Sequence, residues 1–205
     1  DRNLVDVEQE QIRLVFGTTA DLPFMDIGSL ENWRGDVSIS YSKADGDSAR
    51  YGIREDRLDL SLGRYSSSNI PCENDLGVSL AADTSGCVPV NLYAPSLYPT
   101  GNNITGDFAT QAERDYLFGN RDFNTVYEQT LVSLVLDGDI FEMPGGEMAQ
   151  LAVGLEYRND DIQSNPNAVA RDGLFWGYFK DRGAQGDVTL KEVFAEVQLP
   201  IIADK

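Results

Sequence analysis

The chain has 205 residues, 41% of them hydrophobic, and its 34 acidic and 16 basic residues give a formal net charge of −18 at pH 7. A surface this acidic repels nucleic-acid phosphates and anionic leaflets, which argues against nucleic-acid binding and polybasic membrane attachment. Because the chain contains no histidine, catalytic triads built on imidazole are excluded, and the commonest ligand of zinc, copper and iron is missing.

The first two predicted strands lie near the N-terminus. In residues 7–19, Ile12, Leu14 and Phe16 alternate with more polar positions. Residues 33–41 alternate strictly, which is the pattern of a strand with one apolar and one polar face. The apolar set is Trp33, Gly35, Val37, Ile39 and Tyr41, and the polar set is Arg34, Asp36, Ser38 and Ser40.

About 80 residues separate the second predicted strand from the third, which is long for an unstructured connection inside a compact domain. Cys72 and Cys87 lie there in a stretch rich in Pro, Asn and Gly. We expect a disulfide, worth roughly 3 kcal/mol by the chain-entropy argument, and hence an oxidising compartment. A pair of free thiols is the alternative reading.

The same segment contains two helix candidates. Thr110 followed by Glu113 is a capping-box pattern and predicts a short helix over 111–118. Residues 51–65 fit either another short helix or an extension of the preceding strand, and the pattern does not decide between them.

Three further strands are predicted in residues 126–139, 149–158 and 188–200. A bend at Pro144, Gly145 and Gly146 joins the third strand to the fourth. About 14 residues join the first strand to the second and about 25 the fourth to the fifth, so short and long connections alternate. Bacterial membrane barrels, with their short periplasmic turns and long outer loops, have this arrangement.

Four segments resemble the TonB-dependent outer-membrane receptor family. Residues 138–161, GDIFEMPGGEMAQLAVGLEYRNDD, resemble its strand, Pro/Gly turn and strand hairpin. CVPVNLYAP at 87–95 and ITGDFATQAERDYL at 104–117 resemble an outer loop with its short helix, and VTLKEVFAEVQLPII at 188–202 resembles a strand that ends in a periplasmic turn. The likeness spans residues 5–203 and is most specific over 72–160 and 187–202.

The resemblance implies a barrel of roughly 22 strands with a plugged lumen, which imports siderophores, cobalamin, sugars or similar scarce ligands with energy supplied by TonB. No plug domain or TonB box is visible in this chain, and five strands cannot close a barrel in lipid. We therefore expect residues 1–205 to be a partial barrel domain of something longer, located in the bacterial outer membrane.

Residue parity and the resemblance together give the candidate site residues. Polar positions on the strands are predicted to face the lumen: Arg34, Asp36, Gln150, Glu156, Arg158, Glu192 and Glu196. Loop aromatics are predicted to contact the ligand: Tyr93, Tyr98, Trp176 and Tyr178. Plainer alternatives are ion pairing across strands, for instance of Arg158 with Glu192 or Glu196, and packing of the loops on themselves.

The sequence thus predicts an all-β fragment of a large antiparallel transmembrane barrel, with two long outer loops. We expect transport without catalysis, cofactor or resident metal, and we expect lipid, TonB, the plug and a small-molecule ligand as partners. The alternative is a structural or adhesive β-sandwich of the cell surface. A barrel would expose the apolar stripe from Trp33 to Tyr41, whereas a sandwich would bury it against a second sheet.

Overall fold

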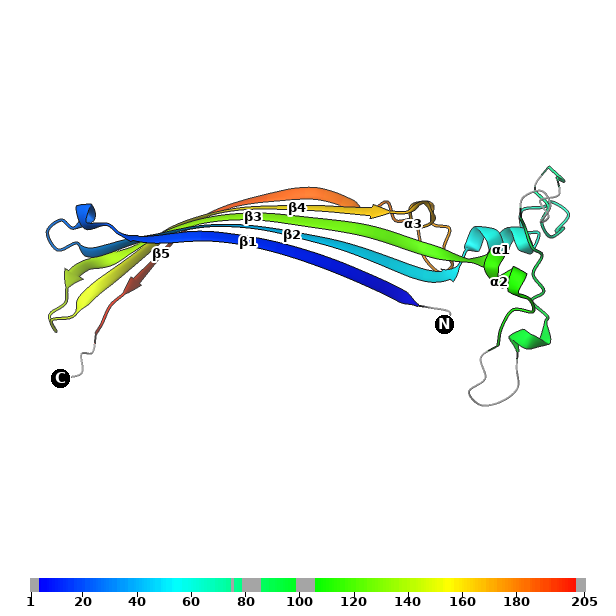
Figure 1. Ribbon diagram of the computed structural model, residues 1–205, viewed down its shortest axis with the longest axis horizontal. Helices are drawn as coiled ribbons and strands as arrows, with labels where there is room; N and C mark the ends of the chain where they lie inside the picture. The colour runs from blue at the N-terminus through cyan, green and yellow to red at the C-terminus, as the bar shows by residue number, and fades with distance from the viewer. Residues whose placement is uncertain (1–3, 75, 79–85, 99–105, 202–205) are drawn as a thin grey trace. The chain divides into compact units, whose positions relative to one another are not determined.

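The computed structural model describes residues 4–74, 76–78, 86–98 and 106–201, and its regular elements are mostly long strands (Figure 1). The strands are β1 (Val5–Asp21), β2 (Glu31–Ile53), β3 (Phe118–Glu142), β4 (Met148–Pro166) and β5 (Ala184–Gln198). The helices are α1 (Glu55–Ser61), α2 (Gln111–Leu117) and α3 (Ala168–Asp172), with 3-10 turns η1 (Pro23–Met25) and η2 (Pro95–Leu97).

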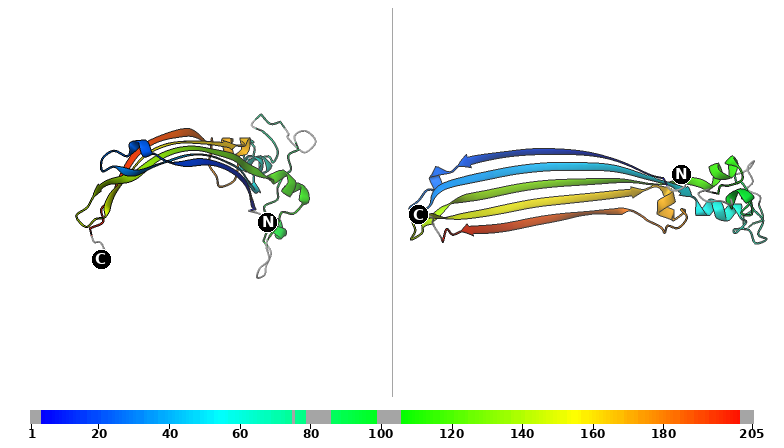
Figure 2. Two further views of the ribbon diagram at one scale, coloured as in Figure 1. Left: turned by 60° about the vertical axis from the view of Figure 1, so that its left-hand side comes forward. Right: turned by 90° about the horizontal axis from the view of Figure 1, so that it is seen from below.

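The five strands form one open sheet in the order β1-β2-β3-β4-β5, so every strand lies beside its neighbour in the chain (Figures 1 and 2). The β4–β5 pair is antiparallel, with Gln150 opposite Gln198 and Ser164 opposite Ala184. β1 and β5 are the two edges. The expectation of an all-β, antiparallel chain is confirmed.

Contacts divide the chain into two units. Unit 1 comprises Asp1–Glu8, Asp47–Asn124 and Asn165–Gly183, and unit 2 comprises Gln9–Gly46, Thr125–Ser164 and Ala184–Lys205. Unit 2 is built from strands and their tight connections, whereas unit 1 holds the three α-helices. Each unit is described separately below.

The strands are longer than their hydrophobic patterns suggest. β2 continues to Ile53 rather than ending at Tyr41, and β3 begins at Phe118 rather than Val126, so the long connection is shortened to residues 54–117. The connection between β4 and β5 is likewise reduced, to residues 167–183. Ladder hydrogen bonds join backbone groups whatever the side chain, so polar and small residues can extend a strand without an apolar stripe.

Unit 1 has a small core of its own, formed by Leu58 of α1, Leu117 of α2, Phe108 and Phe118. The predicted helix at 111–118 is confirmed as α2, and its capping box is complete: Thr110 Oγ1 accepts from Glu113 N at 3.1 Å, and Glu113 Oε2 accepts from Thr110 N at 3.2 Å. Residues 51–65, which fitted either a helix or a strand extension, contain both, since strand β2 ends at Ile53 and α1 begins at Glu55.

In the part of the chain that the structure describes, no helix has the length and apolar character needed to cross a membrane.

Candidate functional site

An apolar belt covers one face of the strands in unit 2. The β4–β5 register sets Leu151 opposite Val197 and Leu155 opposite Val193. The face is shared across the other strands, because Gly35 on β2 adjoins the Leu136 side chain on β3. The belt consists of Ile12, Leu14, Phe16, Val37, Ile39, Tyr41, Val132, Leu134, Leu136, Leu151, Val153, Leu155, Tyr157, Val193, Ala195 and Val197.

The belt is open to its surroundings. Phe16 is 70% exposed, Leu155 52% and Val193 80%, and Val37 and Ile39 are close to half exposed. Within unit 2, the described residues form no second sheet and no helix longer than η1. A contiguous apolar surface of this kind marks an interaction site in a native protein, because leaving it in water is unfavourable.

Charged residues bound the belt on the same face. Beyond Tyr41, Lys43 Nζ lies 2.9 Å from Glu128 Oε1 on the neighbouring strand. Beyond Tyr157, Asp161 on β4 lies directly opposite Asp187 on β5. The apolar character therefore stops at a common level on several strands and is replaced by charge.

The opposite surface of the same strands, the polar face, carries hydrogen-bonding and charged groups. Arg34 Nη2 is 3.5 Å from Asp137 Oδ1 on β3, and its Nε is 3.7 Å from Asp36. Asp36 also accepts a hydrogen bond from the Thr19 hydroxyl of β1. These contacts join β1, β2 and β3 through one face.

All seven residues predicted from parity to face a lumen lie on this polar face. Gln150 of β4 donates to Asp139 of β3 at 3.1 Å, which aligns β4 with β3. In the β4–β5 register, Glu156 is directly opposite Glu192, and Ala152 is opposite Glu196. The structure thus places these side chains on one surface, while their facing a lumen stays a prediction.

The alternative that pairs Arg158 with Glu192 or Glu196 across the strands is wrong. Arg158 lies opposite Leu190, not opposite either glutamate. Its ion pair is with Asp160 on its own strand, at 3.3 Å between Nε and Oδ2. Residues two apart on a strand share a face, so a local acid competes successfully with the diagonal Glu192.

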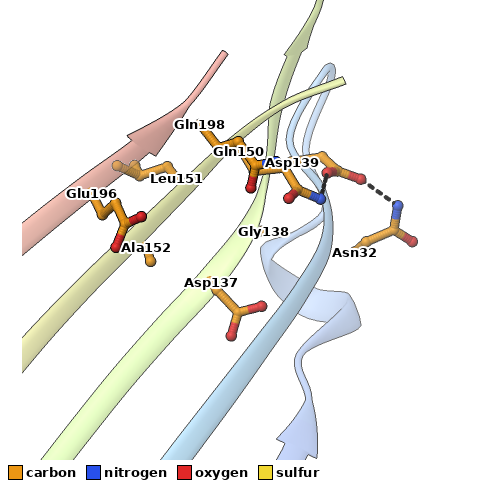
Figure 3. Close-up of a pocket in the computed structure, with 9 residues that line it drawn as sticks. All are labelled: Asn32, Asp137, Gly138, Asp139, Gln150, Leu151, Ala152, Glu196 and Gln198. Carbon is orange, nitrogen blue, oxygen red and sulfur yellow. Dashed lines mark hydrogen bonds between the residues drawn. The ribbon is translucent and has the colours of Figure 1, made fainter. Parts of the chain in front are cut away.

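Asp139 is a buried carboxylate at the edge of a hollow of about 390 Å³ on the polar face (Figure 3). It is 7% exposed. Its oxygens accept from two neutral amides, Asn32 Nδ2 at 2.6 Å and Gln150 Nε2 at 3.1 Å. The hollow also meets Asp137 and Glu196, so three of its nine lining residues are acidic and none is basic.

Sequence reasoning overlooked Asn32 and the neutral members of a second polar group on the same face. In that group Tyr127 Oη and Gln129 Nε2 both donate to Asp160 Oδ1 at 2.8 Å. Parity could have found them, since odd positions on β3 face the same way as even positions on β2 and β4. Leu131 and Val135, which share that parity, obscured the pattern.

In unit 1 the predicted disulfide is confirmed. Cys72 and Cys87 are bonded and nearly inaccessible, at 2% and 0% exposed. The bridge is held against α1, because Cys72 N donates to Leu60 O at 2.9 Å and Ser61 Oγ donates to Val88 O at 2.8 Å. The covalent ring therefore fixes the long connection to the first helix.

Arg57 joins α1 to the end of α2. Its Nη1 donates to Tyr116 O at 2.7 Å and to Phe118 O at 3.2 Å, and the guanidinium lies 5.6 Å from the Tyr116 ring centroid. These bonds satisfy carbonyls that the end of a helix leaves without partners. Burial raises the pKa of the Tyr116 phenol above its ordinary value, against a smaller opposing effect of Arg57.

Only two of the four predicted ligand-contact aromatics come together. Trp176 and Tyr178 line an apolar pocket of about 250 Å³ in unit 1. Tyr93 and Tyr98 are not among its lining residues and are 92% and 67% exposed. The pocket walls are Gly52, Ile53, Leu97, Phe108, Phe118, Phe175, Trp176 and Tyr178.

Neither unit presents a cluster suited to a metal ion, since the described residues contain no group of three or more Cys, Asp or Glu side chains placed to hold one. Comparison with models of protein families and with curated proteins finds no match to this chain.

Proposed function

We propose that this chain is a wall segment of an outer-membrane β-barrel that imports a scarce small molecule, in the manner of the TonB-dependent receptors that it resembles. The observation that carries the proposal is the apolar belt: it extends over all five strands, is exposed, and ends at charged residues. An exposed apolar belt of this kind is stable when it contacts the hydrocarbon core of a membrane.

The two faces of the sheet support the same reading. A membrane barrel alternates apolar positions toward lipid with polar positions toward its interior. Here the belt and the polar face are opposite surfaces of the same strands, and the polar face carries Arg34, Glu156 and Glu192. In the proposed barrel these side chains contact the plug or line the path of the ligand.

The exposed belt also favours the barrel over the sandwich. A sandwich would bury the stripe from Trp33 to Tyr41 against a second layer, but Val37, Ile39 and Tyr41 are 45%, 47% and 37% exposed. Trp33 is the exception at 7% exposed, and its ring is packed over Gly138 of the neighbouring strand β3. The disulfide fits either reading, because both proteins would fold outside the reducing cytosol. The open edges of β1 and β5 would pair with further strands in the complete barrel.

Cell fractionation tests the proposal. The full protein, expressed with its own export signal in a Gram-negative host, should sediment with outer membranes, resist extraction by salt or alkali, and dissolve only in detergent. Uptake should then require the TonB system of the host. A folded monomer that stays in solution without detergent would contradict the barrel, and uptake that is indifferent to TonB would contradict only the energy source.

A further inference from the structure

The pocket between Phe175 and Phe118 in unit 1 has the size of a single ring. Its volume is about 250 Å³. An engineered apolar cavity of about 150 Å³ in another protein binds benzene, so this pocket admits one six-membered ring with a substituent. Of its eight lining residues five are aromatic, and the others are Gly52, Ile53 and Leu97.

The pocket walls are held in place before any ligand arrives. Phe175 is 3% exposed and covers Gly52, where a Cβ atom would come within 2.6 Å of its ring. Trp176 N donates to Ile53 O at 2.9 Å, and the Phe175 and Tyr178 rings meet edge to face at 5.5 Å. Trp176 and Tyr178 nevertheless stay 50% and 38% exposed. A rigid wall with accessible aromatic surface binds at low entropic cost.

A positive charge lies beside Tyr178, one of the residues that line the pocket. The Arg50 guanidinium lies 5.5 Å from the centroid of the Tyr178 ring, and among the described residues Arg50 forms no ion pair. Arg121 approaches the same ring at 4.9 Å, but its charge is compensated by Asp181 at 3.2 Å. Arg50 is therefore a cation that contacts a pocket aromatic and has no acidic partner among the described residues, in a protein with net charge −18.

We propose that the pocket binds a small aromatic anion, with its ring against Phe175, Phe118 and Trp176 and its anionic group at the Arg50 guanidinium. The aromatic walls select the ring, and Arg50 favours an acid over a neutral analogue, since a charge-assisted hydrogen bond is stronger than a neutral one. That such an anion is the imported ligand, or part of it, rests on the proposed uptake function. Binding by the pocket does not.

The test uses the full chain in detergent, with benzoate as the probe and benzyl alcohol as its neutral match. The chain has two tryptophans, so in a Trp33→Phe background Trp176 is the only one that reports. Benzoate should change the Trp176 emission saturably. Saturation-transfer NMR should show benzyl alcohol binding about three- to tenfold more weakly, the size expected for one partly exposed charged contact.

Variants locate the effect. Arg50→Gln should weaken benzoate binding by the same three- to tenfold and leave benzyl alcohol unchanged. Arg182→Gln removes an exposed charge from the β4–β5 connection that carries Trp176, and it should alter neither. Trp176→Ala should reduce the affinity for both probes, and Phe179→Ala, whose ring is 86% exposed, should not. Circular dichroism confirms that each variant is folded.

The inference is overturned if binding is not saturable, if the two probes bind equally, or if Arg182→Gln acts as strongly as Arg50→Gln. These results leave the membrane proposal intact when the protein still sediments with outer membranes. Conversely, selective benzoate binding by a chain that never enters membranes would overturn the proposed function and leave the pocket assignment standing.

Discussion

Single residues on the polar face decide how well the strands of unit 2 pack. Phe194 breaks the alternation of its strand, and the register explains why: it lies opposite Gly154, and its ring covers the glycine so closely that a Cβ atom there would fall 2.1 Å from it. An aromatic ring over a strand glycine restores the packing that the missing side chain leaves out.

Gly154→Val should therefore displace the Phe194 ring and lower the free energy of unfolding by about 1–3 kcal/mol. Combining it with Phe194→Ala should cost less than the sum of the two single changes, because they share one contact. The matched control is Gly186→Val on β5, where a Cβ atom meets nothing within 4 Å. Urea unfolding in detergent measures all four variants, and strict additivity would contradict the packing account.

Asp139 provides a second prediction at this scale. Asp139→Ala should cost about 1–3 kcal/mol, since it removes two hydrogen bonds that the buried Asp139 carboxylate accepts from the amides of Asn32 and Gln150. Asp137 lies two residues away on the same strand and the same face. Asp137→Ala removes a half-exposed ion pair with Arg34 and should cost at most about 1 kcal/mol. Equal unfolding midpoints for the two variants would show that burial of Asp139 is not what matters.

At the scale of elements, α2 depends on its first turn. Thr110→Ala removes one half of the capping box and should destabilise α2 by about 1 kcal/mol. Amide hydrogen exchange should then speed up over 111–117 by roughly fivefold, whereas Ser67→Ala, an exposed hydroxyl in the same connection, should leave it unchanged. Faster exchange in both variants would point to general loosening of unit 1.

The elements that the sequence predicts well are those defined by local interactions, and the others depend on contacts between distant parts of the chain. The capping box, the disulfide and the strict alternation of 33–41 are local signals, and each was read correctly from neighbouring residues. The C-terminal end of β2 and the N-terminal end of β3 carry no apolar stripe, so only backbone pairing with another strand defines them. The pocket beside Tyr178 was beyond prediction for a related reason, because its walls come from five separate stretches of chain, among them Gly52, Leu97 and Phe118.

At the scale of the whole molecule, the two faces of the sheet are proposed to contact different environments: lipid on the belt side and polar groups on the other. Leu155 and Ala152 lie on the same strand and on opposite faces: Leu155 is central in the belt, opposite Val193, and Ala152 lies on the polar face, opposite Glu196. A lysine placed at these two positions therefore compares the two surroundings with backbone and strand unchanged.

If the belt faces hydrocarbon, Leu155→Lys should reduce the free energy of folding into lipid bilayers by about 2–4 kcal/mol, the cost of a lysine near the bilayer midplane. Ala152→Lys should cost far less, because the new ammonium faces polar groups and lies beside Glu196. The measurement is the urea midpoint of the full protein folded into phosphatidylcholine vesicles. If the belt instead packs against protein, the loss of folding free energy will vary with the partner but not with bilayer thickness. Repeating the titration in thinner lipids separates the two cases. A lipid-facing lysine should then destabilise the protein less, since its charge reaches water more easily as the hydrocarbon thins.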